Sequence, residues 1–540
     1  MLRWPDATIY QGLSEIATRT PDAPAVLFDG EETTYGELIE EARAVANGLS
    51  SLGVGRGDTV AVWLSNRPEW LVTQLAASYL GAAVVAVNTR YRTHELEYML
   101  RDSGCRVLVT EESFLEKDYL GMLASLLPEL ERRSPDAFST DEFPNLEAVV
   151  ALSRNDDYPA VRAFEDVRLP GETRAEGPAD DPLATACIFY TSGTTGEPKG
   201  CLQTNRSLLN HSYQVGVHFG LREDDVGLGV LPFCGIWGYN VFMSALAHGL
   251  PLVVQPYFDA ERTIRLIEAH GVTYCSALAT MYVRMLEDEA FAPERVATLR
   301  RGATGFISMG YDEAVFDRIE AAVGFPLVQP YGLSEANSQV FVGDPEDPIE
   351  RRKRVGGPMV HPEEEDARVV DPETGEELPP GEKGELHLRG YNVISGYHEK
   401  PEKTAEDIVD GWLRTGDLVT YDEKGYFYYQ SRLDDALRVR GFLVTPRDIE
   451  SAIDAHPDVA LSQVVGVPHP RHGQVPVAFV RAAAETLDEA ALVDYLDGRV
   501  ADYKIPAAIR FVDEFPRSEG PHGEKIRKNE LRDQVADLFE

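Results

Sequence analysis

A loop between residues 190 and 200 combines glycines, hydroxyl groups and a lysine, which are residue types that bind polyphosphate. The segment ACIFYTSGTTGEPKG runs from an apolar strand into this loop and closes with Lys199 and Gly200. Glycines let backbone N–H groups approach an anion closely, and short hydroxyls add further donors. Lys199 adds a mobile positive charge. The candidate phosphate-binding residues are Thr191, Ser192, Gly193, Thr194, Thr195, Gly196 and Lys199.

The loop differs from the GxxxxGK(S/T) loop of nucleoside triphosphatases. Pro198 stands where that loop has a glycine, and no serine or threonine follows Lys199. A Gly/Ser turn without a ligand would explain the glycines alone. It would not explain a hydroxyl run beside a lysine in a chain that has only ten lysines, of which Lys117 alone precedes Lys199. We therefore favour the phosphate loop.

The elements that must position this loop alternate along most of the chain. From about residue 8 to 430, short β-branched runs alternate with amphipathic stretches, as in TVAVWLSN, PEWLVTQLAASYLGA and AVVAVN. Such alternation predicts an α/β fold in which helices cover parallel sheets. Residues 135–182 are rich in Asp, Glu, Pro and Arg with weak periodicity, so we expect a surface excursion there.

A second, smaller α/β domain is predicted after the turn at Asp434. We expect helices at 447–456 and 488–500 and strands at 461–468 and 476–483. Its roughly 105 residues suit a compact domain. The predicted domains are therefore 1–432 and 433–540.

The charge of the chain is extreme, with a formal value of −39. The acidic residues are dispersed, so nucleic acid is not an expected partner. With lysine scarce, this mixture resembles proteins of salt-loving cells, where dispersed carboxylates maintain solubility. A surface for a basic partner is the rival interpretation, but no acidic block is concentrated enough to serve as one.

The remaining composition indicates a globular cytoplasmic protein. Hydrophobic residues make up 43% of the chain. No apolar run approaches the roughly 20 residues of a transmembrane segment, and the N-terminus lacks the layout of a signal peptide. The five cysteines are scattered without a CxxC pair, which predicts buried thiols rather than disulfides or a zinc cluster. The sequence does not decide whether the protein forms a homodimer.

Several motifs together resemble the adenylate-forming, or AMP-binding, superfamily of acyl-CoA synthetases, luciferases and peptide-synthetase adenylation domains. YTSGTTGEPKG is similar to its signature. GATG at 302–305, YGLSEA at 331–336, GELHLRGYNVISGYHEKPEKTAE and GWLRTGDL follow in the family's order. The resemblance extends from about Thr34 to Arg532. It implies a large N-terminal domain of helix-covered sheets and a smaller mobile C-terminal domain.

The resemblance also implies nucleotide contacts. The residue matching Glu335 holds Mg2+ in relatives, and those matching Tyr331 and Ser334 contact adenine and phosphate. Asp417 would grip the ribose, because a carboxylate accepts from both hydroxyls at once. Arg432 would lie near the ribose. The other implied ATP and AMP contacts are Gly302, Ala303, Thr304 and Gly332.

A catalytic lysine is implied near the C-terminus. FPRSEGPHGEKIRKNELR resembles the family ending PRTxxGKIxKxxLR, whose lysine reaches the reacting carboxylate and phosphate. The alignment of KIRKNELR assigns this role to Lys525. Glu524 replaces the usual glycine, and the stretch from Arg517 to Lys525 is longer by a few residues. Lys528 is the competing candidate, and an ordinary surface lysine at a helix start is the remaining alternative.

SRLDDALRVRGFLVTPRDIE resembles the hinge between the family's two domains, with Asp434 as the pivot and Arg438 and Gly441 on the coenzyme A route. A thiol must approach from where Lys525 had been, so the small domain must swing away. Asp434 and Asp435 could instead cap a turn.

The acyl pocket is expected at LPFCGIWGYN. Gly235 stands where relatives often carry a histidine, and this small residue could admit a branched or aromatic acid. Trp237 and Tyr239 could line the pocket, or they could be ordinary core residues.

The expected activity is an ATP-dependent acid–thiol ligase that uses ATP, Mg2+ and coenzyme A on a fatty or related acid. Positioning and charge neutralisation would drive adenylation, with Lys525, Glu335 and Lys199 as the catalytic residues. One alternative is an adenylation enzyme that delivers the acyl group to another acceptor, although LPFCGIWGYN lacks the acidic residue that an amino-acid substrate needs. Light emission has no support in the sequence. A non-catalytic nucleotide-binding paralogue is the other alternative.

Overall fold

The computed structural model describes residues 2–171, 178–191, 198–305, 313–439, 442–469, 473–484, 487–497, 499–520 and 523–539. The chain divides into two compact units. Unit 1 holds Met1–Gly305, Asp312–Asp366 and Leu388–Leu413, and unit 2 consists mainly of Ala367–His387 and Arg414–Glu540. The predicted α/β class, with a large and a smaller part, is confirmed. The predicted domain boundary at residue 432 concerns which segment moves as the C-terminal domain, and it stays a prediction.

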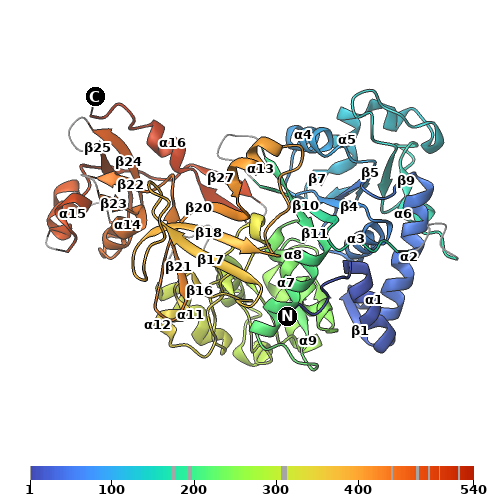
Figure 1. The fold of residues 1–540 in the computed structure, drawn as a ribbon, viewed down its shortest axis with the longest axis horizontal. Coiled ribbons are helices and arrows are strands. Elements are labelled where there is room, and N and C mark those ends of the chain that lie inside the picture. The colour runs from blue at the N-terminus through green and yellow to red at the C-terminus, as the bar shows by residue number, and fades with distance from the viewer. Residues whose placement is uncertain are drawn as a thin grey trace. The chain divides into compact units, whose positions relative to one another are not determined.

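A seven-stranded sheet forms the centre of unit 1 (Figure 1). All neighbouring strands pair in parallel except β10 and β11, which form an antiparallel pair at one edge. In sheet order the strands are β11 Lys199–Thr204, β10 Thr185–Thr191, β4 Ala83–Ala86, β3 Thr59–Trp63, β5 Val107–Thr110, β8 Ala148–Ala151 and β9 Arg162–Ala163.

The central strands are buried on both faces. Val60 and Val62 of β3 belong to one hydrophobic core, and Ala61 and Trp63 belong to the other. This alternation follows from the two-residue period of a strand, and burial on both faces explains why most positions of these strands are apolar. Helices supply the other side of each core, among them α2 Tyr35–Ser51 and α3 Pro68–Leu80 on one face and α4 Thr93–Ser103 and α5 Tyr119–Leu126 on the other.

The expected surface excursion at 135–182 is wrong in part. Strand β8 Ala148–Ala151 is buried and pairs with β5 inside the main sheet. The polar residues around this short apolar run hid it, because four residues are too few for a periodic signal. The excursion also contains η2 Pro135–Ala137, β9 and α6 Phe164–Val167.

A second sheet of unit 1 has the order β12-β13-β1-β2, and helices pack beside it. Helix α8 Ile236–Ala247 is buried along its whole length and packs closely with α7 Asn205–His218. The sheet consists of β12 Gly227–Gly229, β13 Leu252–Val254, β1 Pro24–Phe28 and β2 Glu31–Thr34. Other elements of unit 1 include α1 Ile9–Arg19, α9 Ala260–His270, β14 Ala277–Leu278, α10 Ala279–Glu287, β15 Thr304–Gly305, α11 Glu313–Val323, η4 Ser334–Ala336, α12 Ile349–Arg352 and α13 Pro401–Asp407.

Unit 2 contains the predicted C-terminal elements. Strands β23, β22, β25 and β24 are neighbours in that order, with β26 also on β25. The predicted helices and strands of this part are confirmed as α14 Pro446–Asp454, α15 Glu489–Leu496, β24 Val459–His469 and β25 Gly473–Ala482. The others are β22 Leu437–Val439, β23 Phe442–Val444, β26 Ala508–Phe511, β27 Arg517–Gly520, β28 Gly523–Ile526 and α16 Lys528–Asp533. Strands β21 Tyr426–Arg432, β20 Trp412–Tyr421, β18 Gly384–Gly390 and β17 Glu365–Val370 also lie side by side in that order.

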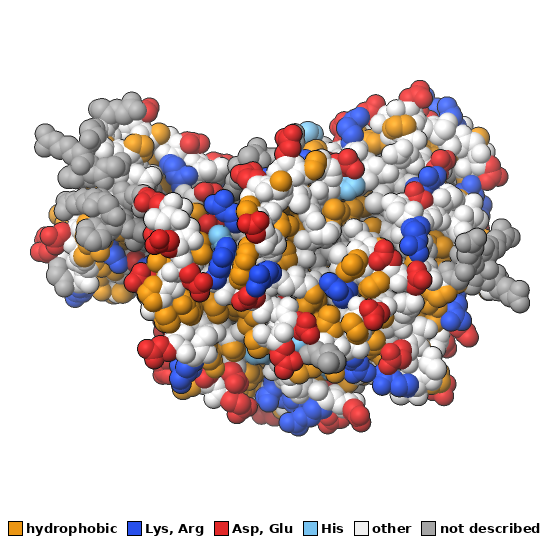
Figure 2. Space-filling model, in the orientation of Figure 1, with side chains coloured by type: hydrophobic (Ala, Val, Ile, Leu, Met, Phe, Trp, Pro, Cys, Tyr) orange, Lys and Arg blue, Asp and Glu red, His pale blue; other side chains and the backbone are white. Residues whose placement is uncertain are grey.

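Two composition-based expectations can be compared with the structure. All five cysteines are free and buried, as predicted. Among the described residues, no helix combines the length and apolar character needed to span a membrane. Acidic and basic side chains are interspersed over the face shown in Figure 2, so the negative charge forms no single block there.

Candidate functional site

The predicted phosphate loop joins β10 to β11 at the edge of the main sheet. Thr191 ends β10 and lies opposite Lys199, the first residue of β11. Ser192, Gly193, Thr194, Thr195 and Gly196 lie outside the described residues. The two strands therefore hold both ends of the loop, and β10 is anchored further by its parallel pairing with β4.

Lys199 lies in a cluster of charged and aromatic side chains. Its Nζ is 3.9 Å from Oδ2 of Asp407 and 4.6 Å from the ring centroid of Tyr397. The ammonium thus has a carboxylate and a π face as partners, a favourable setting for a cation. Asp407 also accepts from Lys403 at 2.7 Å.

Glu335 meets this cluster through the Tyr397 hydroxyl. That oxygen is 3.2 Å from Oε1 of Glu335 and 3.0 Å from Oδ2 of Asp407. One hydroxyl proton can serve only one carboxylate at a time, so the two acids share it. Burial, followed by the charge of Glu335, raises the pKa of Tyr397 well above its usual range, which keeps the donor protonated. We name Lys199, Glu335, Tyr397 and Asp407 the acid–tyrosine cluster.

The predicted adenine-side residues lie at closely packed backbone positions. A Cβ on Gly302 would come within 1.8 Å of the Cys275 carbonyl, and one on Gly332 within 2.3 Å of the Gln339 nitrogen. Both glycines are therefore required by close backbone approach. Ala303 is fully buried, and its N–H donates to Ser276 at 3.2 Å.

Three further predicted nucleotide residues accompany them. The Thr304 hydroxyl is buried and has no hydrogen-bond partner among the described residues, so a ligand donor or acceptor could satisfy it. The Tyr331 ring stacks on Phe341 with centroids 5.8 Å apart. The Ser334 carbonyl accepts from Gln203 at 2.6 Å, which ties the turn containing Glu335 to β11.

The two predicted ribose residues form an ion pair in unit 2. Asp417 and Arg432 are direct partners across β20 and β21. Arg432 Nη1 donates to Asp417 Oδ1 at 2.9 Å. Asp417 is buried, whereas the Arg432 side chain is 39% exposed. The structure thus brings together two residues that were assigned to the same part of the ligand.

Lys525 lies in β28, and its Cα pairs with that of Ser518 on β27. Its side chain lies outside the described residues. The competing candidate, Lys528, begins α16 and donates to Glu450 at 2.7 Å. Lys528 therefore already has a structural partner on α14.

The predicted hinge residue Asp434 occupies an exposed turn after β21. Leu433 N–H donates to the Gly416 carbonyl at 2.8 Å, and Asp435 N–H to that of Arg432 at 3.2 Å. This turn is compatible with either a pivot or a simple cap, so the hinge stays a prediction. Of the coenzyme A residues, Arg438 has only its backbone described, in β22, and Gly441 lies outside the described residues.

The predicted acyl residues lie at the start of α8. Gly235 is the N-cap residue of this helix. A Cβ on Gly305 would lie 3.2 Å from the Trp237 ring, so this ring faces the end of β15. Tyr239 is fully buried among the aromatic rings of Trp70, Phe189 and Phe242, a core environment. Its role in an acyl pocket stays a prediction.

Sequence reasoning missed Tyr397 and Asp407. Tyr397 lies in GELHLRGYNVISGYHEKPEKTAE, which was matched to the family without assigning a side chain, and Asp407 directly follows that stretch. A tyrosine beside two acids has no local signature, because Glu335 is distant in the chain. Only their meeting in the fold identifies them.

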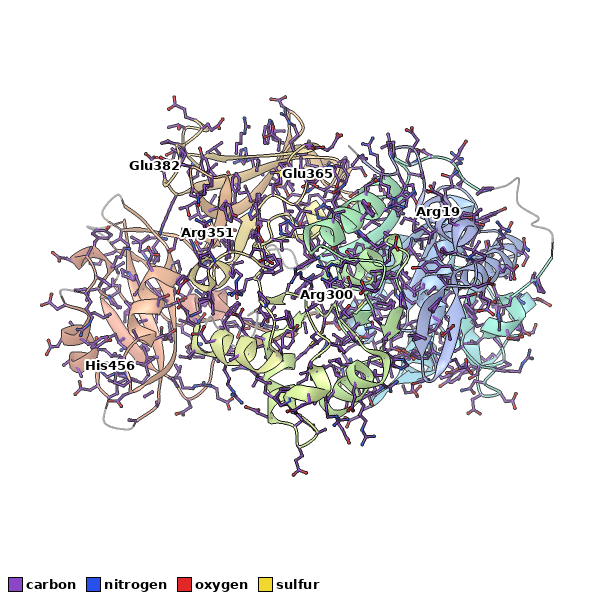
Figure 3. The ribbon with its side chains drawn as sticks, turned by 90° about the horizontal axis from the view of Figure 1, so that it is seen from below. Arg19, Arg300, Arg351, Glu365, Glu382 and His456 are labelled. Atoms are coloured by element: carbon purple, nitrogen blue, oxygen red, sulfur yellow. The ribbon has the colours of Figure 1, made fainter. Side chains whose placement is uncertain are left out.

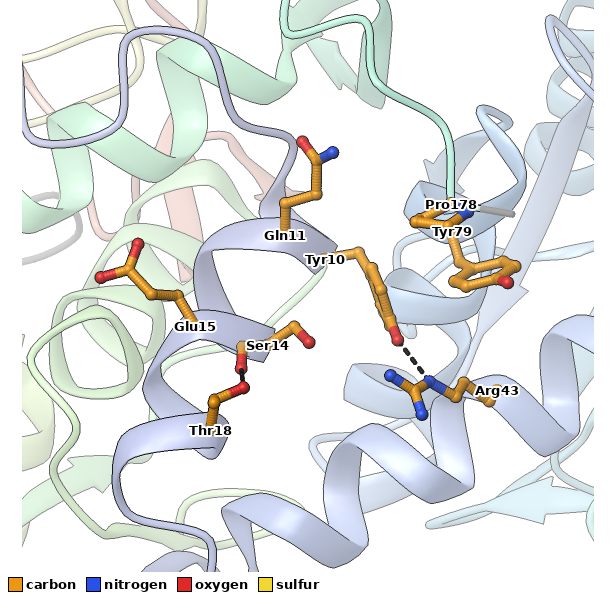
Figure 4. Close-up of a pocket in the computed structure, with 8 residues that line it drawn as sticks. All are labelled: Tyr10, Gln11, Ser14, Glu15, Thr18, Arg43, Tyr79 and Pro178. Carbon is orange, nitrogen blue, oxygen red and sulfur yellow. Dashed lines mark hydrogen bonds between the residues drawn. The ribbon is translucent and has the colours of Figure 1, made fainter. Parts of the chain in front are cut away.

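A cavity of about 320 Å³ lies elsewhere in unit 1 (Figure 4). It is lined by residues of α1, α2 and α3 and by Pro178, and Arg43 Nε donates there to the Tyr10 hydroxyl at 2.6 Å. None of its lining residues was predicted to bind nucleotide.

Comparisons with known proteins agree with the motifs. Residues 13–398 match the family described as AMP-binding enzyme, and 448–520 match the AMP-binding enzyme C-terminal domain. The chain is 32% identical to the mitochondrial medium-chain acyl-CoA ligase ACSF2 of Danio rerio, over 98% of this chain and 88% of that protein.

Two solved structures are similar in fold. ATP-bound MatB from Rhodopseudomonas palustris superposes with a TM-score of 0.83 and 29% identity, covering 99% of this chain and 100% of that one. o-Succinylbenzoate CoA synthetase (MenE) from Bacillus subtilis, in complex with the acyl-adenylate OSB-AMP, gives a TM-score of 0.78 and 27% identity, covering 98% of both chains. The chain therefore belongs to the AMP-binding enzyme family, which confirms the family, the fold and the enzyme class that its motifs predict.

Proposed function

We propose that this enzyme joins a carboxylic acid to coenzyme A in two steps, through an acyl-adenylate, and releases AMP and pyrophosphate. The observation that carries the proposal is the acid–tyrosine cluster. Tyr397 and Asp407 bring the lysine of the phosphate loop and the acid of YGLSEA into one place. Two similar proteins, a medium-chain acyl-CoA ligase and a CoA synthetase bound to an acyl-adenylate, support this activity.

The donor set suits Mg2+ carried by ATP. Mg2+ is usually bound by one or two carboxylates together with substrate phosphates and water, rather than by an all-protein cage. Glu335 supplies one carboxylate, and the carboxylate of Asp407 lies on the other side of the Tyr397 hydroxyl. The described residues contain no group of three or more acidic, histidine or cysteine side chains that could hold a metal ion. When bound, Mg2+ would neutralise phosphate charge.

In the first step, a carboxylate oxygen attacks the α-phosphorus of ATP. The new O–P bond forms as the bond to the β-phosphate oxygen breaks, and pyrophosphate leaves. Both reactants are anionic, so the chain must orient them and disperse the negative charge. Lys199, the N–H groups of the phosphate loop and Lys525 do this, while Asp417 and Arg432 hold the ribose.

In the second step, the coenzyme A sulfur attacks the acyl carbon and AMP leaves. The thiol needs the space that Lys525 fills during adenylation. The C-terminal domain therefore rotates about Asp434 between the steps, which opens a route along Arg438 and Gly441.

The substrate is a fatty or related acid that fits beside Gly235 and Trp237. Gly235 has no side chain at the N-cap of α8, so we expect this position to admit a branched or aromatic group. The dispersed charge of −39 further suggests a protein adapted to high salt.

A panel of straight, branched and aromatic acids tests the proposal, with AMP and pyrophosphate measured in low and high salt and with or without coenzyme A. We expect AMP release that requires an acid, and thioester formed only with coenzyme A. Adenylate formation without thioester would favour a different acceptor. ADP and phosphate as the only products, or no ATP binding, would contradict the proposal.

A further inference from the structure

Three consecutive residues after Glu335 have left-handed backbone. Asn337, Ser338 and Gln339 have φ values of 59°, 58° and 40°. Residues other than glycine adopt this conformation at a cost, usually singly rather than in runs. Such a run persists only where its surroundings hold it, and it often marks a functional site. We name Asn337–Gln339 the left-handed segment.

Buried groups of α7 and α8 hold each of these three residues, through a backbone carbonyl for Asn337 and through side chains for Ser338 and Gln339. Asn337 Nδ2 donates to the Ser207 carbonyl at 2.9 Å. His211 Nε2 lies 2.9 Å from the Ser338 carbonyl. Gln339 Nε2 donates to Asn240 Oδ1 at 2.6 Å.

His211 differs from the other two anchors because it is ionisable and has partners on both ring nitrogens. It is fully buried, and its Nδ1 lies 2.9 Å from Oε1 of Glu365. A carbonyl oxygen only accepts, so Nε2 must carry a hydrogen. The contact between Nδ1 and Oε1 then needs one further proton, on either the ring or the carboxyl group. The two contacts leave the ring a single orientation.

Glu365 is itself buried, at the start of β17, and is labelled in Figure 3. Burial, followed by the charge of Glu365, raises the pKa of the Tyr391 hydroxyl, and His361 Nδ1 lies 3.2 Å from that hydroxyl. The anchor of Ser338 therefore lies among further polar side chains and is not an isolated contact. Networks of this kind constrain the backbone more than single hydrogen bonds do.

The left-handed segment follows Glu335 after a single residue, Ala336. Ser338 N–H donates to the Leu333 carbonyl at 2.9 Å, which closes a loop around Glu335. Gly332 lies against Ser338 and Gln339 so closely that no Cβ fits. A shift of Ser338 would therefore move the backbone on both sides of Glu335.

We propose that His211 is a positioning residue for the nucleotide site. Its two hydrogen bonds hold the left-handed segment, and this segment orients Glu335 toward the ATP-bound Mg2+. The inference rests on the proposed function for the role of Glu335. It assigns to His211 no contact with the reacting atoms.

The experiment measures ATP binding by calorimetry, in Mg2+ and in EDTA, for four variants. His211→Ala removes both contacts. Glu365→Gln keeps them, because its amide can donate to Nδ1 of a neutral ring. His211→Gln can still donate to Ser338 but turns an oxygen toward Glu365. The double variant His211→Gln/Glu365→Gln restores a donor between the two side chains.

His248→Gln is the matched control. His248 is another buried histidine of unit 1, and its Nδ1 donates to the Ser244 carbonyl at 2.8 Å, with burial lowering its pKa to about 4. It should behave as the wild type in both conditions.

We expect His211→Ala to lose about 10- to 100-fold in affinity for ATP in Mg2+, the usual range for groups that support a metal ligand, with little change in EDTA. Glu365→Gln should remain close to wild type, His211→Gln should weaken, and the double variant should recover. Equal losses in Mg2+ and EDTA, or no loss, would overturn the inference. If His211→Ala does not fold, recovery in the double variant decides.

If the wild-type enzyme binds ATP equally well in Mg2+ and in EDTA, both the role of Glu335 and this inference are wrong. If Mg2+ strengthens ATP binding by the wild type and His211→Ala binds ATP as the wild type does, only this inference is wrong.

Discussion

Two antiparallel hairpins carry the two candidate catalytic lysines, and they differ in how they are held. Lys199 begins β11, whose partner β10 is also paired with β4 inside a seven-stranded sheet. Lys525 lies in β28, which forms a separate two-stranded sheet with β27 in unit 2. The first hairpin is built into a core, whereas the second resembles a ribbon, a form that is only marginally stable alone.

The difference teaches that the two lysines suit different tasks. Lys199 has fixed partners in Asp407 and Tyr397, so its charge is oriented before ATP arrives. Pre-organised charge of this kind lowers the cost of binding. A lysine on a small ribbon suits a group that is delivered for one step and withdrawn for the next. We therefore expect substitutions to separate binding at Lys199 from chemistry at Lys525.

The largest expected effect is that of Lys525→Ala on adenylation. Loss of one well-placed charge donor typically costs on the order of 10²–10³ in rate, and the melting temperature should barely change. Acid-dependent pyrophosphate exchange and thermal melting measure both. Lys528→Ala is the control, since it breaks the ion pair with Glu450 but should leave exchange intact. A wild-type rate of pyrophosphate exchange in Lys525→Ala would show that Lys525 is not needed for adenylation, and the proposed difference between the two lysines would be wrong.

A smaller effect should follow from Asp434→Pro, which fixes one backbone dihedral at the proposed pivot. Adenylation should be spared, and thioester formation should slow on the order of tenfold, a barrier increase of about 1.4 kcal/mol. Single-turnover measurements of each half-reaction test this. Equal loss in both half-reactions would show that Asp434 only caps its turn. It would contradict the proposal that the C-terminal domain rotates about Asp434.

The smallest rate effect should be that of Lys199→Ala. The KM for ATP should rise about tenfold, since a charge-assisted hydrogen bond contributes about 1.5 kcal/mol or more, while kcat falls less than in Lys525→Ala. The protein should also lose about 1 kcal/mol of stability, because Lys199 packs over Tyr397 and faces Asp407. A kcat loss as large as that of Lys525→Ala, with KM unchanged, would assign both lysines the same task.

Much of the fold could be predicted because its signals are local. The alternation in TVAVWLSN and PEWLVTQLAASYLGA corresponds to β3 and α3, and the C-terminal helix around residue 450 corresponds to α14. Strand β8 escaped prediction because four apolar residues inside a polar stretch carry no period. Its assignment depends on pairing with β5, which is distant in the chain.

The candidate site divides in the same way. Glu335, Lys199, Asp417 and Arg432 could be named because each lies in a motif of neighbouring residues. Tyr397, Asp407 and His211 could not, because their respective partners Glu335, Lys199 and Glu365 are far away in the chain.

By itself, the amino-acid sequence determined the family and the two-part α/β organisation, and it predicted the residues of the phosphate loop, since backbone periodicity and motif spacing are properties of neighbouring residues. Only the tertiary structure decided which side chains hold those residues in place. The Tyr397 hydroxyl is shared between two acids, and His211 is fixed between Ser338 and Glu365, because folding brings distant segments within hydrogen-bond distance.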